Sequence, residues 1–376
     1  MCKLEGEATE SLNLAVIVKH FNLLGGAEKY AVETTRRLIS RGHRVDLYSW
    51  EADEGLLAGI NHIKIPCRLN ISSSTRLWAF GRDVSKQLAK KKYDAVLSHD
   101  RTGCQDISVV HTFSYKTGMD RYPGFRKIDQ IWMSPRAWVY LWMEKQQMNR
   151  PVLVPVSRII EKDIIRHYPK AKNISVITPG IDTNGFSPGA IQDRRKKIRA
   201  REGIPEKDLA VLFVGSEFRR KGLDLLIPAI DQGMQLLVAG RGENMSFYRK
   251  RVSQCGNQSR VSFLGLQKNM PDWFAAADVV VLPSKAEAFG MAVLEGMACS
   301  LPVIAGQALG ASCLIRHNEN GFICKNRDDI ARLLVRLKDP SLRKRIGENA
   351  RRTALENSWD ICTDHFEALC FNLKRP

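Results

Sequence analysis

Short apolar runs alternate with helical patterns along the whole chain, which is typical of parallel sheets covered by helices on both faces. In the first half, the runs predict strands at residues 13–18, 44–49, 93–98, 107–113, 152–155 and 174–178. In the second half, they predict strands at residues 209–215, 235–240, 261–264, 279–283, 302–305 and 321–324. The two series predict two separate sheets in an α/β protein.

The chain has 376 residues, more than one core ordinarily holds, and we expect two domains. Turn-forming residues concentrate at 178–188 and are followed by a basic run at 193–202, so the hinge is predicted there. The domains are then 1–180 and 181–357. The tail, 358–376, has apolar residues at helical spacing and is expected to pack back on the first domain.

One apolar stretch carries an isolated charge. Between residues 288 and 305, Glu295 is the only charged residue. The pattern predicts a short buried helix at 289–299 followed by a core strand. A buried carboxylate without a partner is costly, so Glu295 is expected to meet a positive group or a cluster of hydroxyl donors.

A second carboxylate, Glu287, stands eight residues earlier, just before the first turn of this helix. The exposed amides of that turn and the helix dipole favour an anion such as a phosphate. These are the amides of Phe289, Gly290 and Met291. Two carboxylates beside an anion site indicate a sugar nucleotide as the ligand.

Two loops after predicted strands are further candidates. Gly25 and Gly26 stand between the first strand and a helix, where a phosphate or sugar can approach the backbone, although a plain tight turn is an equally good interpretation. Three consecutive cations follow the first strand of the second series, in the order Arg219, Arg220 and Lys221. They would clamp a pyrophosphate by charge-assisted hydrogen bonds, the alternative being a solvated loop.

The composition is that of a globular protein, with 44% hydrophobic and 26% charged residues, but the net charge of +18 favours polyanionic partners. The nine cysteines include no C-x-x-C pair, and several stand in apolar runs, so we expect reduced, mostly buried thiols and no structural zinc. We see no basic leader and no apolar run of the roughly 20 residues that a spanning helix needs. These features favour a cytoplasmic protein.

Six motifs, in chain order, give the sequence a resemblance to retaining glycosyltransferases of the GT-B fold (group 1, or family 4 type). They are Gly25-Gly26, His111-Thr-Phe, Pro179-Gly-Ile-Asp182, Arg220-Lys-Gly222, Phe263-Leu-Gly265 and the pair Glu287 and Glu295. The resemblance covers nearly the whole chain and implies two Rossmann-like domains facing a central cleft. Among members, the run Gly-Ser-Glu-Phe-Arg-Arg-Lys-Gly is most similar to lipopolysaccharide core glucosyltransferase I.

Carried over to matching positions, the resemblance implies that Glu295 binds the ribose hydroxyls and Glu287 the hydroxyls of the donor sugar. This agrees with the pattern, because vicinal hydroxyls are donors that can satisfy a carboxylate. Lys221 and an adjacent arginine, Arg220 in the first place, would neutralise the departing diphosphate.

The remaining donor contacts are implied in the same way. The first-turn amides and Gly26 would face the diphosphate, and the loop that begins at Leu266 would receive the base. Many members have an arginine where this chain has Ser216, so the clamp is expected to depend on Arg219 or Arg220. Because lysine and arginine replace a D-x-D carboxylate site, no metal is expected.

His111 and Asp100 both stand at expected strand ends. In the family, a histidine at the position of His111 contacts the donor sugar near the reacting carbon; a histidine satisfied in a core is the alternative interpretation. Asp100 would orient the acceptor hydroxyl. The resemblance implies front-side attack with retention, in which the donor phosphate accepts the proton of the acceptor. UDP-glucose is the favoured donor, with other UDP-hexoses, GDP-mannose and ADP-heptose left open, and no further cofactor is expected.

Residues 111–150 combine seven Lys and Arg residues with three acidic ones and three of the seven tryptophans, Trp132, Trp138 and Trp142. Cations mixed with amphipathic aromatic side chains suit the headgroup region of an anionic membrane. We therefore expect peripheral attachment to the inner face of the cytoplasmic membrane. The alternative is that Trp138, Leu141 and Trp142 fill the core of the first domain.

The sequence thus predicts a hexosyltransferase whose acceptor is a lipopolysaccharide core or a related glycolipid. A sugar-nucleotide epimerase is one rival, but it needs carboxylates and a histidine poised for elimination in the first domain, where no clear set is visible. A nucleic-acid-binding protein is the other rival. Its basic residues would cluster, whereas here they are spread and no reading motif is visible, so no nucleic-acid partner is expected.

Overall fold

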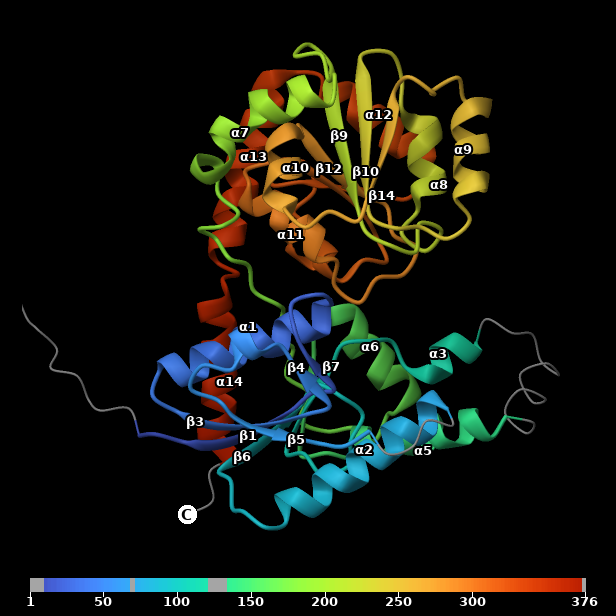
Figure 1. Cartoon of the computed structure of the whole chain (residues 1–376). Helices are drawn as coiled ribbons and strands as arrows, with labels where there is room; N and C mark the ends of the chain where they lie inside the picture. Colours follow the sequence, from blue (N-terminus) through green and yellow to red (C-terminus); the bar gives the residue numbers. More distant parts are fainter. Residues whose placement is uncertain (1–9, 68–71, 121–133, 374–376) are drawn as a thin grey trace, which may run out of the picture. The chain divides into compact units, whose positions relative to one another are not determined.

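The computed structural model describes residues 10–67, 72–120 and 134–373. The chain divides into two compact units: unit 1 comprises the residues up to 178 together with those from 359, and unit 2 comprises residues 179–358. In the described residues, each unit contains one six-stranded parallel sheet with helices on both faces (Figure 1). The predicted pair of Rossmann-like α/β domains is confirmed.

The sheet of unit 1 has the strand order β5-β3-β1-β6-β7-β8. Its strands are β1 (Asn13–Ile17), β3 (Arg44–Ser49), β5 (Asn61–Lys64), β6 (Ala95–Ser98), β7 (Ile107–Val110) and β8 (Val152–Pro155); a separate pair is formed by β2 (His20–Phe21) and β4 (Glu51–Ala52). Its helices are α1 (Gly26–Ser40), α2 (Ser73–Leu88), α3 (Tyr115–Met119), α5 (Pro135–Met148), α6 (Arg158–His167) and α14 (Trp359–Leu373).

Five of the six strands predicted for the first half are confirmed, and the sixth, at 174–178, is wrong. Only Ile174 forms a bridge, to Leu153 of β8. The backbone continues to pair as far as the hydrogen bond from Ile177 N–H to the carbonyl of Pro155, at 3.3 Å. Pro155 has no N–H to donate in return, so the parallel ladder stops.

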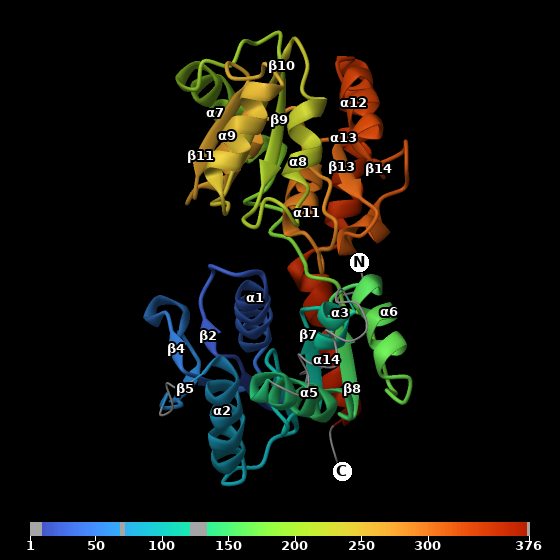
Figure 2. The same ribbon diagram turned by 90° about the vertical axis from the view of Figure 1, so that its right-hand side faces the viewer.

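Unit 2 repeats the topology, with the strand order β11-β10-β9-β12-β13-β14 (Figure 2). Its strands are β9 (Leu209–Val214), β10 (Met234–Ala239), β11 (Val261–Gly265), β12 (Val279–Leu282), β13 (Val303–Gly306) and β14 (Phe322–Cys324). Its helices are α7 (Pro188–Arg201), α8 (Leu223–Leu226), α9 (Met245–Gln254), α10 (Met270–Ala276), α11 (Met291–Ala298), α12 (Arg327–Arg336) and α13 (Pro340–Leu355). All six strands predicted here are confirmed.

The basic run at 193–202 is not part of a hinge. It lies in α7, which packs on α10. The Arg199 guanidinium is buried and pairs with Asp278 at 3.1 Å, and it donates to the carbonyl of Asp208 at 2.8 Å. The prediction failed because a run of cations is typical of a solvent-exposed segment. Here one of its arginines instead joins the helix to the amino edge of the sheet.

The tail forms α14, as its spacing predicted, and packs on α1 of unit 1. Its buried face carries Trp359, Cys362, Phe366 and Cys370. The Trp359 ring meets the Tyr30 ring edge-on, with the centroids 5.5 Å apart. Unit 1 is therefore completed by residues that follow unit 2 in the chain.

Four of the eight described cysteines are buried, which is fewer than the predicted majority; they are Cys299, Cys324, Cys362 and Cys370. Cys67 and Cys313 are exposed; Cys67 follows β5, and Cys313 lies in the short 3-10 helix Gly310–Leu314. Within the described residues, no helix combines the length and the apolar composition that crossing a bilayer demands.

Candidate active site

The carboxyl edge of the unit 2 sheet carries a cluster of one carboxylate and two cations. Glu287 follows β12, and its Oε2 lies 2.8 Å from Arg220 Nη1 and 3.5 Å from Lys221 Nζ, both of which follow β9. The carboxyl ends of β9 and β12 are neighbours in a parallel sheet, so residues far apart in sequence meet there. The Glu287 side chain is 15% exposed, which leaves it accessible to a ligand.

Arg220 is held firmly by the protein itself. Glu217 accepts from its Nε at 2.7 Å and its Nη2 at 3.2 Å, while Nη1 donates to Glu287 and, at 2.7 Å, to the carbonyl of Ala286. Partial burial lowers the pKa of Arg220, but the carboxylates of Glu217 and Glu287 outweigh burial and raise it. The hydrogen bond from Arg220 in turn lowers the pKa of Glu217. Arg220 therefore positions Glu287.

Sequence reasoning missed Glu217, although its spacing of three residues from Arg220 is a usual signal for a pair. Because Arg220 is engaged, the cations best placed to meet an incoming anion are Lys221 and the exposed Arg219. Lys221 needs the glycine at the end of β9. Gly215 has φ +142°, and a Cβ there would lie 2.5 Å from the Lys221 Cδ.

Backbone hydrogen bonds fix the Glu287 segment on both sides. The Glu287 amide donates to the carbonyl of Ala308 at 3.0 Å, and its carbonyl accepts from Gly310 at 3.0 Å. A Cβ at Gly310 would lie 2.7 Å from the Phe289 Cα, so this close approach requires glycine. The carboxylate is thus carried by a rigid loop.

The helix α11 begins with its first-turn amides free of any side-chain cap. Gly290 is the N-cap, with φ +94° and no capping side chain, and a Cβ there would meet Leu309 at 2.9 Å. Phe289 packs its ring into the core and Met291 is half-buried. Uncapped amides at a helix start attract anions, so this part of the predicted phosphate site is present as geometry.

Glu295 lies on α11 but is half-buried, whereas the sequence predicted a buried carboxylate. The residues around it on α11 are buried, namely Ala292, Val293, Leu294, Gly296, Met297 and Ala298. An eight-residue helix that packs most of its surface still leaves one strip open, and Glu295 occupies that strip. The apolar run therefore predicted the helix correctly, but it predicted too much burial for Glu295.

Of the remaining predicted donor residues, Ser216, Leu266 and Gly25 lie outside regular elements and Gly26 is the first residue of α1. Ser216 is exposed after β9, and Leu266, at 65% exposure, follows the last residue of β11. Gly25 and Gly26 belong to unit 1, where Gly25 is the N-cap of α1 without a capping side chain. A Cβ at Gly26 would meet nothing within 4 Å, so its backbone is open to an approaching group.

In unit 1, two histidines meet at the carboxyl edge of the sheet. His111 follows β7 and His99 follows the neighbouring β6, and His99 Nδ1 lies 3.0 Å from His111 Nε2. The Tyr30 ring packs edge-on against His111 at 5.2 Å. Burial lowers the pKa of His111 to about 3, and burial together with His111 holds the pKa of His99 well below its ordinary value.

A neutral imidazole has one N–H and one acceptor nitrogen, so one ring donates and the other accepts in this contact, which couples the tautomers of the two rings. Sequence reasoning missed His99. The signal was available, because neighbouring parallel strands end side by side and both histidines directly follow a strand.

Asp100 stands in the same loop as His99, but both of its oxygens are engaged with Lys19. Oδ2 accepts from the Lys19 amide at 2.7 Å, and Oδ1 lies 3.0 Å from Lys19 Nζ. The carboxylate thus ties the end of β6 to the end of β1. Asp100 belongs to unit 1 and Glu287 to unit 2.

Two acidic side chains hold the loop after His111. Glu144 of α5 is fully buried and accepts from Ser114 Oγ at 2.9 Å, from the Tyr115 amide at 2.9 Å and from the Tyr168 hydroxyl at 2.7 Å. Asp163 accepts from the Ser114 amide at 2.6 Å. Nothing in the aromatic, basic pattern of this segment indicated that Glu144 would be buried.

The alternative that the tryptophans of α5 fill the core is wrong for Trp138 and Trp142, which are each 52% exposed. The buried residues of this helix are instead Ala137, Met143, Glu144, Gln147 and Met148. Several residues of the predicted membrane segment lie outside the described residues, namely Arg121, Tyr122, Arg126, Lys127 and Trp132.

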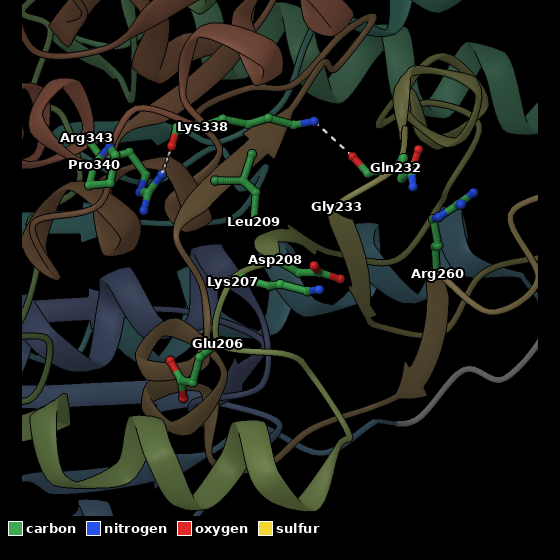
Figure 3. Close-up of a pocket in the computed structure, with 10 residues that line it drawn as sticks. All are labelled: Glu206, Lys207, Asp208, Leu209, Gln232, Gly233, Arg260, Lys338, Pro340 and Arg343. Atoms are coloured by element: carbon green, nitrogen blue, oxygen red, sulfur yellow. Dashed lines mark hydrogen bonds between the residues drawn. The ribbon is translucent and has the colours of Figure 1, made fainter.

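A hollow of about 650 Å³ lies at the opposite, amino edge of the unit 2 sheet, where Leu209 begins β9 (Figure 3). Two of its cations serve the backbone: Lys338 Nζ donates to the Gln232 carbonyl at 2.8 Å, and Arg343 Nη1 donates to the Lys338 carbonyl at 3.0 Å. Because ligands of such sheets bind at the carboxyl ends of the strands, the Glu287 cluster is the candidate site in unit 2.

Comparison with known proteins identifies the family of the chain. Residues 194–353 match the family model "Glycosyl transferases group 1", and residues 24–184 match "Glycosyltransferase Family 4". A D-inositol 3-phosphate glycosyltransferase of Corynebacterium glutamicum (strain R) is 31% identical over 388 residues, covering 89% of this chain and 88% of that protein. Another of the same name, from Xylanimonas cellulosilytica, is 27% identical and covers 89% of each chain.

Solved structures share the fold. WaaG, a glycosyltransferase involved in lipopolysaccharide biosynthesis, superposes with a TM-score of 0.81 at 21% identity, covering 95% of this chain and 99% of its own. HepE from Anabaena, in complex with UDP and glucose, has a TM-score of 0.77 at 18% identity, covering 96% of this chain and 100% of its own. Fold and relatives together define a GT-B glycosyltransferase. The chain belongs to the group 1 glycosyltransferases.

Proposed function

We propose that the protein transfers a hexose from a nucleotide-sugar, with UDP-glucose as the first donor to test, and that the anomeric configuration is retained without a metal ion. The observation that carries the proposal is the carboxyl edge of unit 2. There Glu287 is fixed by Arg220, Lys221 lies 3.5 Å from it, and the uncapped start of α11 follows within the same loop. Carboxylate, cation and free amides match the hydroxyls and the phosphates of one ligand.

In this proposal, Glu287 accepts from hydroxyls of the donor sugar and Glu295 from the ribose. Lys221 and the first-turn amides neutralise the diphosphate as it leaves, which is the main source of rate acceleration. A phosphate oxygen takes the proton of the attacking hydroxyl on the same face of the sugar. In unit 1, the neutral His111 contacts the transferred sugar, where an imidazole without charge donates or accepts a single hydrogen bond.

For the acceptor, we propose a glycolipid of the lipopolysaccharide core type. The exposed tryptophans of unit 1 and the fold shared with WaaG support it. A second candidate is a phosphorylated polyol, because the sequence relatives that cover most of the chain are named D-inositol 3-phosphate glycosyltransferases. Inositol phosphate and a glycolipid are each incubated with the protein and UDP-glucose. The acceptor whose presence leads to consumption of UDP-glucose is the one that the protein uses.

We further propose that the protein works at the inner face of the cytoplasmic membrane, attached through the 111–150 region. Trp138 and Trp142 are half exposed on α5, and Arg136 lies one turn before Tyr140 on the same helix. Such amphipathic rings and cations favour an anionic headgroup layer. Vesicle flotation with anionic lipid tests this. Binding that persists after neutralising Arg121, Arg126, Lys127 and Arg136 contradicts the attachment.

A thermal-shift panel of UDP-glucose, other UDP-hexoses, GDP-mannose and ADP-heptose identifies the donor. Glu295→Ala should then abolish the stabilisation by that nucleotide while the unliganded melting temperature changes little, because Glu295 is half-buried rather than part of the core. Glu319→Ala is the matched control, since this glutamate of unit 2 is 66% exposed in its side chain. Undiminished stabilisation in Glu295→Ala would remove Glu295 from the site.

A further inference from the structure

Unit 1 carries an apolar groove that the donor chemistry does not use. The helices α2 and α5 lie side by side (Figures 1 and 2). Between them is a hollow of about 400 Å³ lined by Thr75, Trp78, Trp138, Val139 and Trp142. Trp78 is 39% exposed, and Trp138 and Trp142 are 52% exposed. Large aromatic side chains gathered at an exposed apolar hollow mark a binding surface.

The groove continues along both helices. A second hollow of about 330 Å³ shares Trp78 and Trp142 with the first and reaches Arg82 and Lys86 on α2. The Arg82 guanidinium lies 5.1 Å from the centre of the Trp78 ring. Because Arg82 is itself paired with Asp83 at 3.2 Å, the shape and the apolar lining of this elongated channel define its ligand, which is a long apolar chain.

The direction of the groove follows from the topology. α2 precedes β6 and α5 precedes β8, so each helix runs from the carboxyl edge of the sheet back to the amino edge where its strand begins. The beginnings of the two helices are tied together, because the Tyr140 hydroxyl donates to Ser73 Oγ at 3.3 Å. The hollow lined by Trp138 is therefore the end of the groove that lies nearer the carboxyl edge.

That end is connected to the histidine. Tyr140 stacks on Tyr115 with the ring centroids 5.5 Å apart, and the Arg101 guanidinium lies 5.8 Å from the centre of the Tyr140 ring. Arg101 also donates to Oγ1 of Thr112, the residue after His111, at 3.3 Å. An unbroken series of contacts thus leads from the groove to the edge at which an acceptor hydroxyl would be presented.

We propose that the groove between α2 and α5 binds one acyl chain of an anionic lipid amphiphile, and that this chain is the apolar end of the acceptor. The assignment to an acceptor rests on the proposed transferase function; the binding of the chain does not. The tail lies along Trp138, Trp142 and Trp78, and the polar end lies toward Arg101 and His111. A bilayer surface would touch the tips of the indoles, whereas a single chain lies between them.

The test uses the full chain with brominated stearate, below its micellar concentration and without vesicles. Bromine quenches indoles that it contacts, so we expect saturable quenching of tryptophan fluorescence that unbrominated stearate reverses and inorganic phosphate does not. Val139→Asp keeps all three indoles but places a carboxylate in the hollow, and binding should weaken at least about tenfold. Val335→Asp is the matched control, because this valine is 54% exposed and belongs to unit 2 rather than to the unit that carries the groove.

A second variant protects the test against misfolding. Ser85 lines the second hollow and is exposed on α2, so Ser85→Phe fills the groove without adding charge and should also weaken binding. Absence of saturable quenching in the unmodified protein overturns the proposal. Quenching in both groove variants that is as strong as in the unmodified protein also overturns it. A dimer that Val139→Asp dissociates, without any quenching, would instead assign the groove to a second copy of the chain.

The same samples separate this proposal from the proposed function. UDP-glucose should stabilise Val139→Asp as much as the unmodified protein, because unit 2 is unchanged. Quenching without stabilisation by any nucleotide-sugar would contradict the transferase proposal and leave a lipid-binding site. Stabilisation by a nucleotide-sugar without quenching would contradict only the proposal that the groove binds an acyl chain.

Discussion

The two carboxyl edges of this protein have the same framework and different chemistry. Both sheets are parallel, with six strands in the same topological order. The edge of unit 2 gathers charge: Glu217 and Glu287 around Arg220, with Lys221 close by. The edge of unit 1 carries a pair of neutral rings, His99 and His111 against Tyr30, beside the ion pair of Lys19 with Asp100.

Under the proposed function, the difference matches what each edge would meet. An edge that receives a diphosphate has to supply positive charge without reorganising, and Arg220 already holds Glu287 beside Lys221 before any ligand arrives. An edge that meets sugar hydroxyls needs single hydrogen bonds from groups that stay uncharged, and burial keeps the two histidines in that state. One fold thus carries two kinds of site because the loops, rather than the strands, hold the chemistry.

The largest expected effect concerns the charged edge. Lys221→Met removes the cation that lies 3.5 Å from Glu287 while keeping the length of the side chain, and kcat should fall by about 100- to 1000-fold, as for the loss of one donor that stabilises transition-state charge. Steady-state kinetics with the identified donor measures the change. Lys285→Met is the control, since Lys285 pairs with Asp224 at 2.7 Å rather than with Glu287. A comparable loss in both variants would mean that Lys221 acts only through general charge.

An intermediate effect is expected at the support of the neutral edge. Glu144→Gln leaves Arg101 without its carboxylate and sets an amide against the Ser114, Tyr115 and Tyr168 donors, so unit 1 should lose about 2–3 kcal/mol of stability. Denaturant unfolding followed by tryptophan fluorescence measures the loss. Glu51→Gln, at an exposed carboxylate of the same unit, should change stability by less than about 0.5 kcal/mol. Equal stability of the two variants would show that Glu144 is replaceable.

The smallest effect is a pH dependence that only the neutral edge should show. The pKa values of His99 and His111 are lowered in the folded protein. Below the unfolded pKa of about 6.5, the unfolded chain therefore binds protons that the folded protein does not bind. The stability from each histidine is complete above that pH and is lost as pH falls toward the folded pKa, by up to about 1.4 kcal/mol per pH unit.

Unfolding measured at pH 6.5 and pH 5.5 tests this, and His99→Asn should remove about one such slope. His20→Asn serves as the control, because the His20 side chain is 36% exposed and lies outside the pair. An unchanged slope in His99→Asn would place the pH dependence elsewhere and weaken the contrast between the two edges.

The sequence predicted the repeated α/β framework because strands buried on both faces give continuous apolar runs, as in β9 and β12. It missed β5 because Asn61, His62 and Lys64 mix polar residues into an edge strand. It wrongly predicted a strand at 174–178 because the missing N–H of Pro155, in the neighbouring β8, leaves no mark in hydrophobicity.

At the candidate site, the sequence identified the residues of unit 2 that stand in unusual patterns, but not how they divide the work. Glu217 engages Arg220 and leaves Lys221 less engaged. This division depends on a loop in which Glu217 has φ +56°, and no sequence pattern encodes such a conformation. Glu144 was missed for a related reason, since its burial depends on donors contributed by two other elements, Ser114 before α3 and Tyr168 after α6.

The place of α14 has a consequence for biosynthesis. Residues 179–358 form an uninterrupted insertion within the residues of the other unit. A gene fragment for that insertion encodes a complete sheet with its helices, whereas no single fragment without it encodes a complete partner. On the ribosome, unit 1 would be completed only after unit 2, since Trp359 and Phe366, which cover Tyr30, emerge after residues 179–358.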